Sequence, residues 1–128
     1  MNKNFPKREK LKSAKTIENL FLEGKSHFKF PIKVFFLPKP NIPVDKENLD
    51  INLAAFTVPK RNFKSAVDRN RIKRQLREVY RLNKHLLDEK EDGKLLMLFL
   101  FLGKVKPQYA DLDKAMVNLL SKLAKEVD

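Results

Sequence analysis

Hydrophobic positions along the chain follow helical spacing in three stretches and strand spacing in three others. The first helical stretch is predicted over residues 14–23, where apolar positions lie three and four residues apart. Ser13 precedes it as a candidate N-cap, and Gly24 follows it as a candidate C′ residue. The apolar face of this helix consists of Ile17, Leu20 and Phe21.

Strand patterns occupy residues 30–37, 51–58 and 95–102. The first alternates, so it should have one core face and one mixed face. The core face contains Ile32, Val34 and Phe36, and the mixed face contains Lys33, Phe35 and Leu37. The last, LLMLFLFL, shows no alternation and predicts a strand buried on both faces. Residues 38–48 contain three prolines and predict a loop.

A longer helix is predicted from residue 66 to about residue 87. Ser65 and Asp68 fit a capping box, in which the serine hydroxyl accepts the Asp68 backbone N–H and the Asp68 carboxylate reaches back. At ~100° per residue, one side of this helix is apolar and a separate arc is cationic. The apolar side contains Ile72, Leu76, Val79, Leu86 and Leu87, with Tyr80 at its edge. The cationic arc contains Asn70, Lys73, Arg74, Arg77, Arg81 and Lys84.

The third amphipathic helix is predicted over residues 107–127. Asp111 and Asp113 lie near its positive N-terminal end. Its apolar stripe, which core packing explains, consists of Leu112, Met116, Leu119, Leu120 and Leu123. Ahead of the last predicted strand, the acidic run 88–92 ends at Gly93 and predicts a turn.

Length and composition predict a single domain over residues 1–128, with residues 1–10 extended or flexible. The chain is 42% apolar and 34% charged, and its lack of cysteine fits a reducing compartment. The N-terminal residues lack the apolar segment of a secretory signal. The longest apolar run is eight residues, too short to span a bilayer. We therefore expect a cytoplasmic protein without a membrane partner.

Positive charge is concentrated in one fifth of the chain. The 28 basic and 16 acidic residues give a net charge of +12, and residues 60–84 alone contain ten basic and two acidic residues. Like charges four residues apart on a helix, such as Arg77 and Arg81, repel each other unless a partner relieves them. The arginine bias favours phosphate of a nucleic acid over an anionic membrane as that partner.

Catalytic groups are harder to find. His27 and His85 lie in different predicted elements, and neither has a carboxylate at a spacing that suggests a zinc site or a triad. The acids of 88–92 could bind a divalent ion, although a solvated turn explains them better. Three glycines provide no phosphate-binding loop. A protein that handles RNA without such groups should be a binder whose partner performs the chemistry.

The segment FTVPKRNFKSAVDRNRIKRQLRE, residues 56–78, resembles the signature of the protein subunit of bacterial ribonuclease P. Its centre is Arg69-Asn70-Arg71, carried by a strand, a loop and a basic helix. The resemblance implies an α+β two-layer sandwich, with a roughly four-stranded sheet, three helices and a left-handed β-α-β crossover. It also implies a non-catalytic subunit of an endoribonuclease that hydrolyses a phosphodiester and removes the 5′ leader of precursor tRNA.

The resemblance also implies two sets of site residues. The set facing the catalytic RNA consists of Lys60, Arg61, Arg69, Asn70, Arg71, Lys73, Arg74, Arg77 and Arg81. The set lining a groove for the single-stranded leader consists of Ile17, Phe21, Lys33 and Phe35. No protein side chain is expected to be catalytic or to bind a metal, and Mg²⁺ is expected through the RNA.

The implied partners are ribonuclease P RNA, with one protein per RNA and no obligate homo-oligomer, and precursor tRNA. Three alternatives stay open at this point. A basic, ribosomal-protein-like RNA-binding protein without a processing role would have the same composition. A helix-turn-helix DNA-binding module would need a helix where a strand and loop are predicted. A protein-only nuclease would need catalytic carboxylates.

Overall fold

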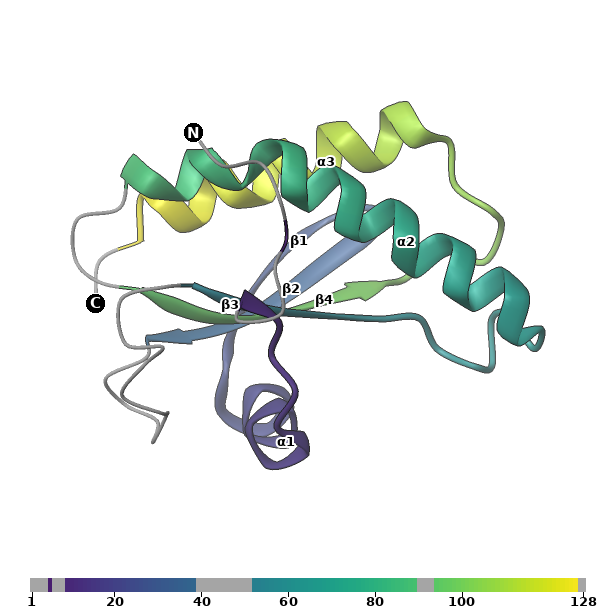
Figure 1. The fold of residues 1–128 in the computed structure, drawn as a ribbon, viewed down its shortest axis with the longest axis horizontal. Coiled ribbons are helices and arrows are strands. Elements are labelled where there is room, and N and C mark those ends of the chain that lie inside the picture. Colours follow the sequence, from purple (N-terminus) through teal and green to yellow (C-terminus); the bar gives the residue numbers. More distant parts are fainter. Residues whose placement is uncertain (1–4, 6–8, 39–51, 90–93, 127–128) are drawn as a thin grey trace.

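The computed structural model describes residues 5, 9–38, 52–89 and 94–126 (Figure 1). The segments 39–51 and 90–93 lie outside these residues, and so do most of the predicted loop 38–48 and the end of the acidic run. In chain order the elements are α1 (Ala14–Glu23), β1 (Lys25–Lys29), β2 (Ile32–Pro38), β3 (Leu53–Thr57), α2 (Ala66–Asn83), the 3₁₀ helix η4 (Lys84–Glu89), β4 (Leu95–Phe101) and α3 (Tyr109–Ala124).

The four strands form one mixed sheet in the order β1-β2-β4-β3. β2 is antiparallel to both β1 and β4, and β3 is parallel to β4. α2 connects the parallel pair above the sheet, and the chain passes from β3 in front to β4 behind (Figure 1). This crossover is left-handed, against the preference of about 98% of such connections. The α+β class, the four-stranded sheet and the three helices are confirmed.

The helices cover the two faces of the sheet unequally. α2 and α3 lie together over one face, and α1 lies alone on the other (Figure 1). The larger core, between the sheet and α2 and α3, includes the predicted faces of β2, α2 and α3. The smaller core, between the sheet and α1, consists of Leu11, Leu20, Leu53, Leu96 and Leu98.

β4 contributes to both cores. Leu95, Met97 and Phe99 point into the larger core, and Leu96 and Leu98 point into the smaller one. All five are at most 1% exposed, which confirms the prediction of a strand buried on both faces.

The prediction of one strand over residues 30–37 was wrong at its start. Phe30 and Pro31, joined by a cis peptide bond, form the turn of a hairpin, and β2 begins at Ile32. The preceding strand, β1, was not predicted. Its residues Lys25–Lys29 are mostly exposed, so hydrophobic alternation gave little indication of it.

The predicted ends of α1 are confirmed. Ser13 Oγ accepts the Thr16 backbone N–H at 3.2 Å, as an N-cap does. Gly24 follows the helix with φ of −69°, so left-handed backbone does not explain the glycine there. A Cβ at this position would lie 2.4 Å from the Leu20 carbonyl oxygen, so close approach of the backbone explains it.

α2 follows its prediction closely. Ser65 Oγ accepts the Asp68 backbone N–H at 3.4 Å, but the Asp68 carboxylate lies 3.4 Å from Lys106 Nζ instead of reaching back to the cap. Tyr80, predicted at the edge of the apolar side, is fully buried, and that burial raises the pKa of its hydroxyl. The α-helix ends at Asn83 and continues as η4, which keeps the predicted Leu87 in the core.

The described part of the N-terminal segment contacts the outer edge of β3. Lys10 forms a parallel bridge with Ala54, and the Leu11 N–H donates to the Ala54 carbonyl at 2.9 Å. Phe5 packs edge-on against Phe56 and Tyr80, with ring centroids 5.7 and 5.4 Å apart. These contacts cover an edge of the sheet that would otherwise be open.

Within the described residues, no helix is both long enough and apolar enough to cross a bilayer.

Replacing Gly24 by alanine separates two explanations for this glycine. If chain flexibility alone mattered, alanine would stabilise the protein by ~0.4–1 kcal/mol, because φ of −69° suits any residue. Because the new Cβ would meet the Leu20 carbonyl oxygen, we expect Gly24→Ala to destabilise the protein by ~1–3 kcal/mol in denaturant unfolding. Ser26→Ala, at an exposed position nearby, should leave the midpoint unchanged.

Candidate nucleic-acid interface

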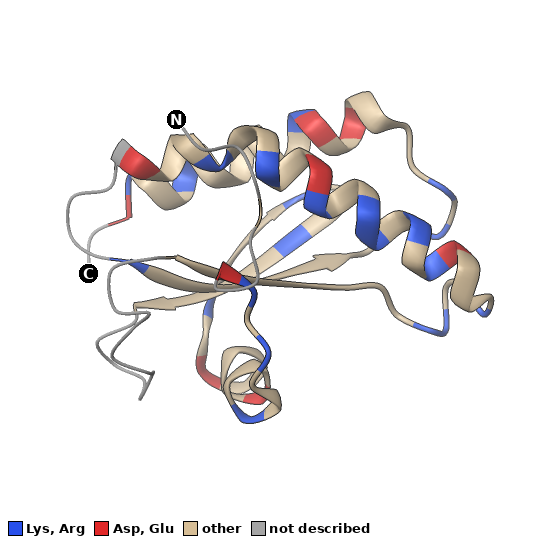
Figure 2. Ribbon diagram, in the orientation of Figure 1, with Lys and Arg blue, Asp and Glu red and all other residues tan. Residues whose placement is uncertain are grey.

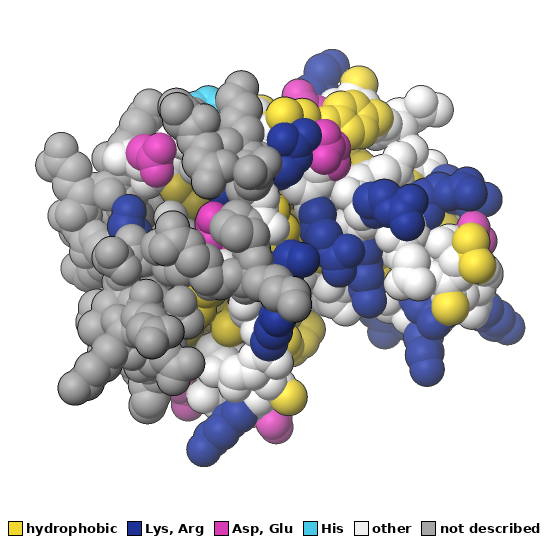
Figure 3. All heavy atoms as spheres, viewed as in Figure 1, with side chains coloured by type: hydrophobic (Ala, Val, Ile, Leu, Met, Phe, Trp, Pro, Cys, Tyr) yellow, Lys and Arg dark blue, Asp and Glu magenta, His cyan; other side chains and the backbone are white. Residues whose placement is uncertain are grey.

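The outer side of α2 and the loop before it form the basic ridge, which consists of Lys60, Arg61, Arg69, Asn70, Arg71, Lys73, Arg74, Arg77 and Arg81. Blue residues follow α2 and the preceding loop in Figure 2, and their side chains gather in Figure 3 on the N-terminal half of the helix. Ile72 and Leu76 anchor the underside of this helix in the core. The predicted separation of a core side from a cationic side is therefore present in the fold.

Arg69 holds the loop that precedes α2. Its Nη1 donates to the Phe63 carbonyl at 2.8 Å and to the Lys64 carbonyl at 2.9 Å. Phe63 is buried and packs against Phe101, with ring centroids 5.9 Å apart. The first arginine of the Arg-Asn-Arg motif therefore fixes the loop that brings Lys60 and Arg61 beside the helix, a role that the sequence did not indicate.

Arg81 is engaged by a carboxylate of its own helix. Its Nε and Nη2 donate to the two Glu78 oxygens at 3.1 and 2.5 Å. The hydrogen bond from Arg81 lowers the pKa of Glu78, so the carboxylate stays charged and offsets this end of the ridge. Lys84, the last residue of the predicted cationic arc, forms an ion pair with Glu9 at 2.8 Å.

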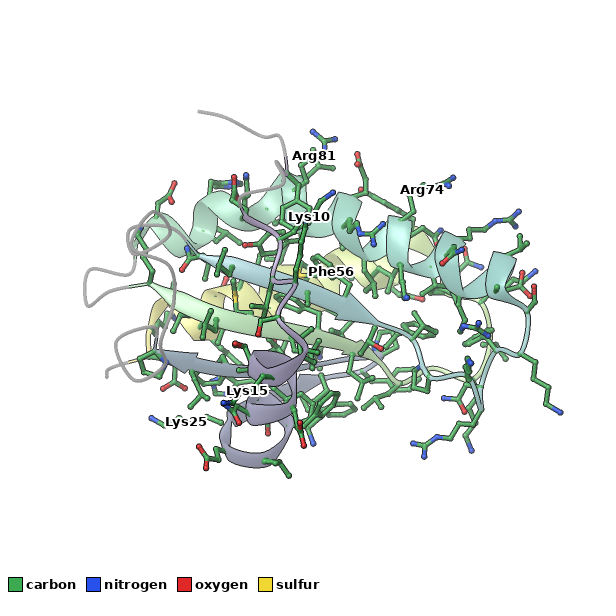
Figure 4. All side chains as sticks on the ribbon, turned by 60° about the horizontal axis from the view of Figure 1, so that its bottom comes forward. Lys10, Lys15, Lys25, Phe56, Arg74 and Arg81 are labelled. Atoms are coloured by element: carbon green, nitrogen blue, oxygen red, sulfur yellow. The ribbon has the colours of Figure 1, made fainter. Side chains whose placement is uncertain are left out.

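The middle of α2 carries the charges that remain accessible. Arg71, Arg74 and Arg77 are exposed, and within the described part of the chain none of them forms an ion pair. Figure 4 shows Arg74 projecting outward from α2 on the same side as Arg81. Three neighbouring guanidinium groups that face solvent can each form a fork of hydrogen bonds to a phosphate.

The four predicted groove residues come together on the opposite face of the sheet, beside α1. The Phe21 and Phe35 rings lie 5.1 Å apart, and Lys33 Nζ lies 4.9 Å from the Phe35 centroid. Ile17 and Phe35 pack against the smaller core. Phe21 is 46% exposed and Phe35 is only partly so, which leaves Phe21 as the more accessible ring.

Sequence reasoning missed one aromatic residue on this face. Phe28 pairs with Lys33 across β1 and β2, so both side chains lie on the same side of the sheet. Phe28 is 52% exposed and extends the aromatic side chains of this face toward the β1–β2 turn. The alternation of Ser26 and Phe28 with Lys25, His27 and Lys29 is the pattern that could have revealed it.

The two histidines lie apart from each other, in β1 and in η4. His27 Nε2 lies 2.6 Å from Glu126 Oε1, and its ring stacks on Phe36, so it links β1 to the end of α3. His85 lies in η4, far along the chain from this pair. In the part of the chain that the structure describes, no three histidines, cysteines or acids gather as a metal site would require.

Comparison with known proteins decides between the alternatives. The family model described as Ribonuclease P matches residues 5–124. A relative from Porphyromonas gingivalis (strain ATCC BAA-308 / W83), named ribonuclease P protein component, is 31% identical over 124 residues, which span 94% of this chain and 87% of that protein. The chain belongs to the ribonuclease P protein family. A Clostridium botulinum (strain Langeland) protein of the same name is 29% identical across 91% of this chain and 95% of its own.

Solved ribonuclease P proteins have the same fold. The Staphylococcus aureus protein superposes with a TM-score of 0.68 at 19% identity, covering 91% of this chain and 95% of that one. The Thermotoga maritima protein superposes with a TM-score of 0.69 at 22% identity, covering 89% and 96%.

Membership in the ribonuclease P family gives the chain its general role. It is a protein subunit of an endoribonuclease complex that processes tRNA and contains an RNA partner. The resemblance inferred from residues 56–78 is therefore confirmed, and an RNA-binding protein without a processing role is not favoured.

The two arginines of the Arg-Asn-Arg motif should differ in their effect on stability. Arg69→Ala removes two charge-assisted hydrogen bonds to loop carbonyls, and we expect it to lower the free energy of unfolding by ~1–3 kcal/mol. Arg71→Ala, at an exposed position of the same helix, should change it by less than ~0.5 kcal/mol. Urea unfolding of both variants measures the difference, and equal losses would contradict the role assigned to Arg69.

Proposed function

We propose that this subunit binds the catalytic RNA of ribonuclease P through the basic ridge and the 5′ leader of precursor tRNA through the groove beside α1. It thereby assists hydrolysis of the phosphodiester bond that joins the leader to the mature tRNA 5′ end. The catalytic centre belongs to the RNA, with Mg²⁺ bound there. The protein supplies positioning and charge.

One observation carries the proposal: the ridge and the groove lie on opposite faces of one sheet. α2 rises above the sheet and α1 lies below it (Figure 1). A folded RNA can therefore occupy the ridge while a second strand occupies the groove, without competition for one surface. Both surfaces are attached to β4, so their separation is fixed by a buried strand.

The chemistry of the ridge suits a folded RNA. Its accessible groups are guanidinium and ammonium ions, which bind phosphate oxygens irrespective of base sequence. They lie along a straight helix, so they can follow neighbouring phosphates of a structured backbone. The apolar underside of α2 is buried in the core, which holds the cationic side chains on the outer side of the helix.

The chemistry of the groove suits an unpaired strand. Lys33 already lies over the Phe35 ring, so a base stacks more readily on the exposed Phe21, while Lys33 contacts the neighbouring phosphate. An aromatic ring beside a cation accepts any base, because every base has a π face. Such a groove holds leaders of varied sequence.

Reconstitution tests the proposal directly. We expect purified protein to restore leader removal by a bacterial ribonuclease P RNA at low magnesium. Arg71→Ala should weaken binding to that RNA and flatten the slope of log K against log salt by roughly 0.7–0.9, the contribution of one phosphate contact.

The matched control is Lys122→Gln, at an exposed cation on α3, far from the ridge along the sequence. It should leave the slope of the wild-type protein unchanged. RNA binding without restored cleavage would support a general RNA-binding role instead. Cleavage by the protein alone, lost on replacing its carboxylates, would indicate a protein-only nuclease.

Phe21 and its neighbour Leu22 provide a test of the groove. Phe21→Ala should lose ~1–3 kcal/mol of affinity for leader-bearing precursor tRNA in the assembled complex, the value for one stacked base. Leu22 is 74% exposed on the same helix and is not among the residues packed against the smaller core. Leu22→Ala should therefore have no effect. Equal losses for leaderless and leader-bearing tRNA would contradict the role of Phe21.

A further inference from the structure

A cavity lies on the α3 side of the sheet, and its lining residues belong neither to the basic ridge nor to the groove beside α1. It has a volume of about 520 Å³ and is enclosed by the β1–β2 turn, the connection from β4 to α3, and the first two turns of α3. Binding sites for small ligands typically measure ~300–1,000 Å³, so one nucleotide fits this space. The walls are joined by a hydrogen bond of 2.7 Å from the Leu102 N–H to the Pro31 carbonyl.

The groups that line this cavity are cationic and aromatic. Lys29, Lys106 and Lys114 come from three different elements, and Asp111 is the one acid among the lining residues. Phe30, at the turn, is 66% exposed, so its ring is available to a ligand. An exposed ring among three ammonium groups matches a base and its flanking phosphates. The Asp111 carboxylate can accept a hydrogen bond from a base amino group or a ribose hydroxyl.

At Gly103 the backbone lies directly against the aromatic floor of the cavity. This glycine is buried against the Phe101 ring, and a Cβ there would lie 2.6 Å from the Phe101 Cζ atom. Both residues line the cavity, so the bare backbone at Gly103 leaves the aromatic floor in place.

Two contacts connect the cavity to the basic ridge. Lys106 Nζ lies 3.4 Å from the Asp68 carboxylate in the first turn of α2. Phe101 packs against Phe63, whose carbonyl is bound by Arg69 of the ridge. An RNA seated on the ridge therefore reaches the cavity across the first turn of α2.

We infer that this cavity binds an unpaired nucleotide of the ribonuclease P RNA, with its base on Phe30 and its phosphates on Lys29 and Lys114. The inference rests on the proposed function, which places that RNA on the ridge. Precursor tRNA is the less suitable occupant, because its leader groove lies on the other face of the sheet, beside α1.

Paired lysine substitutions test the inference. Lys29→Gln/Lys114→Gln removes two cations that line the cavity, and Lys25→Gln/Lys122→Gln removes two exposed cations from the same strand and helix outside it. For binding to a bacterial ribonuclease P RNA, the first pair should flatten the salt slope by roughly 1.4–1.8, or two phosphate contacts. The second pair should leave the slope unchanged. Equal slopes for the two pairs would overturn the inference.

A cross-linking arm identifies the occupant. With photoreactive benzoylphenylalanine in place of Phe30, we expect cross-links to ribonuclease P RNA in the assembled complex. The same group in place of Leu22, on α1, should give none to that RNA. Cross-links only to precursor tRNA, only to a second copy of the protein, or to nothing would overturn the inference. Wild-type protein that does not bind the RNA would refute the proposed function as well, whereas normal binding with unaffected cavity variants refutes the cavity alone.

Discussion

Burial of β4 on both of its faces is the constraint on which the rest of this structure depends. Strands β2 and β3 pair with its two sides, and the two hydrophobic cores meet on its alternating side chains. A strand that excludes water from both faces requires cover above and below, which α2 and α3 provide on one side and α1 on the other. The two functional surfaces lie on these covering helices. The ridge is the outer side of α2, and the groove lies beside α1.

Electrostatic repulsion along α2 is accommodated by the fold without being removed. Arg69 and Arg81, towards the two ends of the row, are held by loop carbonyls and by Glu78. The middle of the row, including Arg74, keeps its charges exposed. Leucine and isoleucine side chains on the underside of the helix supply the burial that offsets this repulsion. The free protein thus holds a preformed cationic row, and less reorganisation is needed when phosphate arrives.

Sequence reasoning succeeded where one local pattern determines the outcome. The cap at Ser65, the apolar stripe of α2 and the continuous hydrophobicity of β4 each follow from periodicity and elementary stereochemistry. It failed at β1, because an exposed edge strand of five residues needs no hydrophobic alternation to pair with β2. The hand of the crossover and the contact of Phe21 with Phe35 depend on tertiary packing, which no local window contains. The motif around Arg69 indicated RNA binding, but only the folded loop shows that this arginine also holds its own backbone.

The bridge between Lys10 and Ala54 has a consequence for the protein in a crowded cell. A sheet with an exposed edge strand can pair with strands of neighbouring molecules and aggregate. Here Lys10 and Leu11 of the same chain occupy the outer edge of β3 at Ala54, and the other edge strand, β1, carries lysines at both of its ends, which repel an identical strand. Both features disfavour edge-to-edge pairing of two copies, even though β4, a continuous apolar strand, has the composition of an aggregation-prone segment.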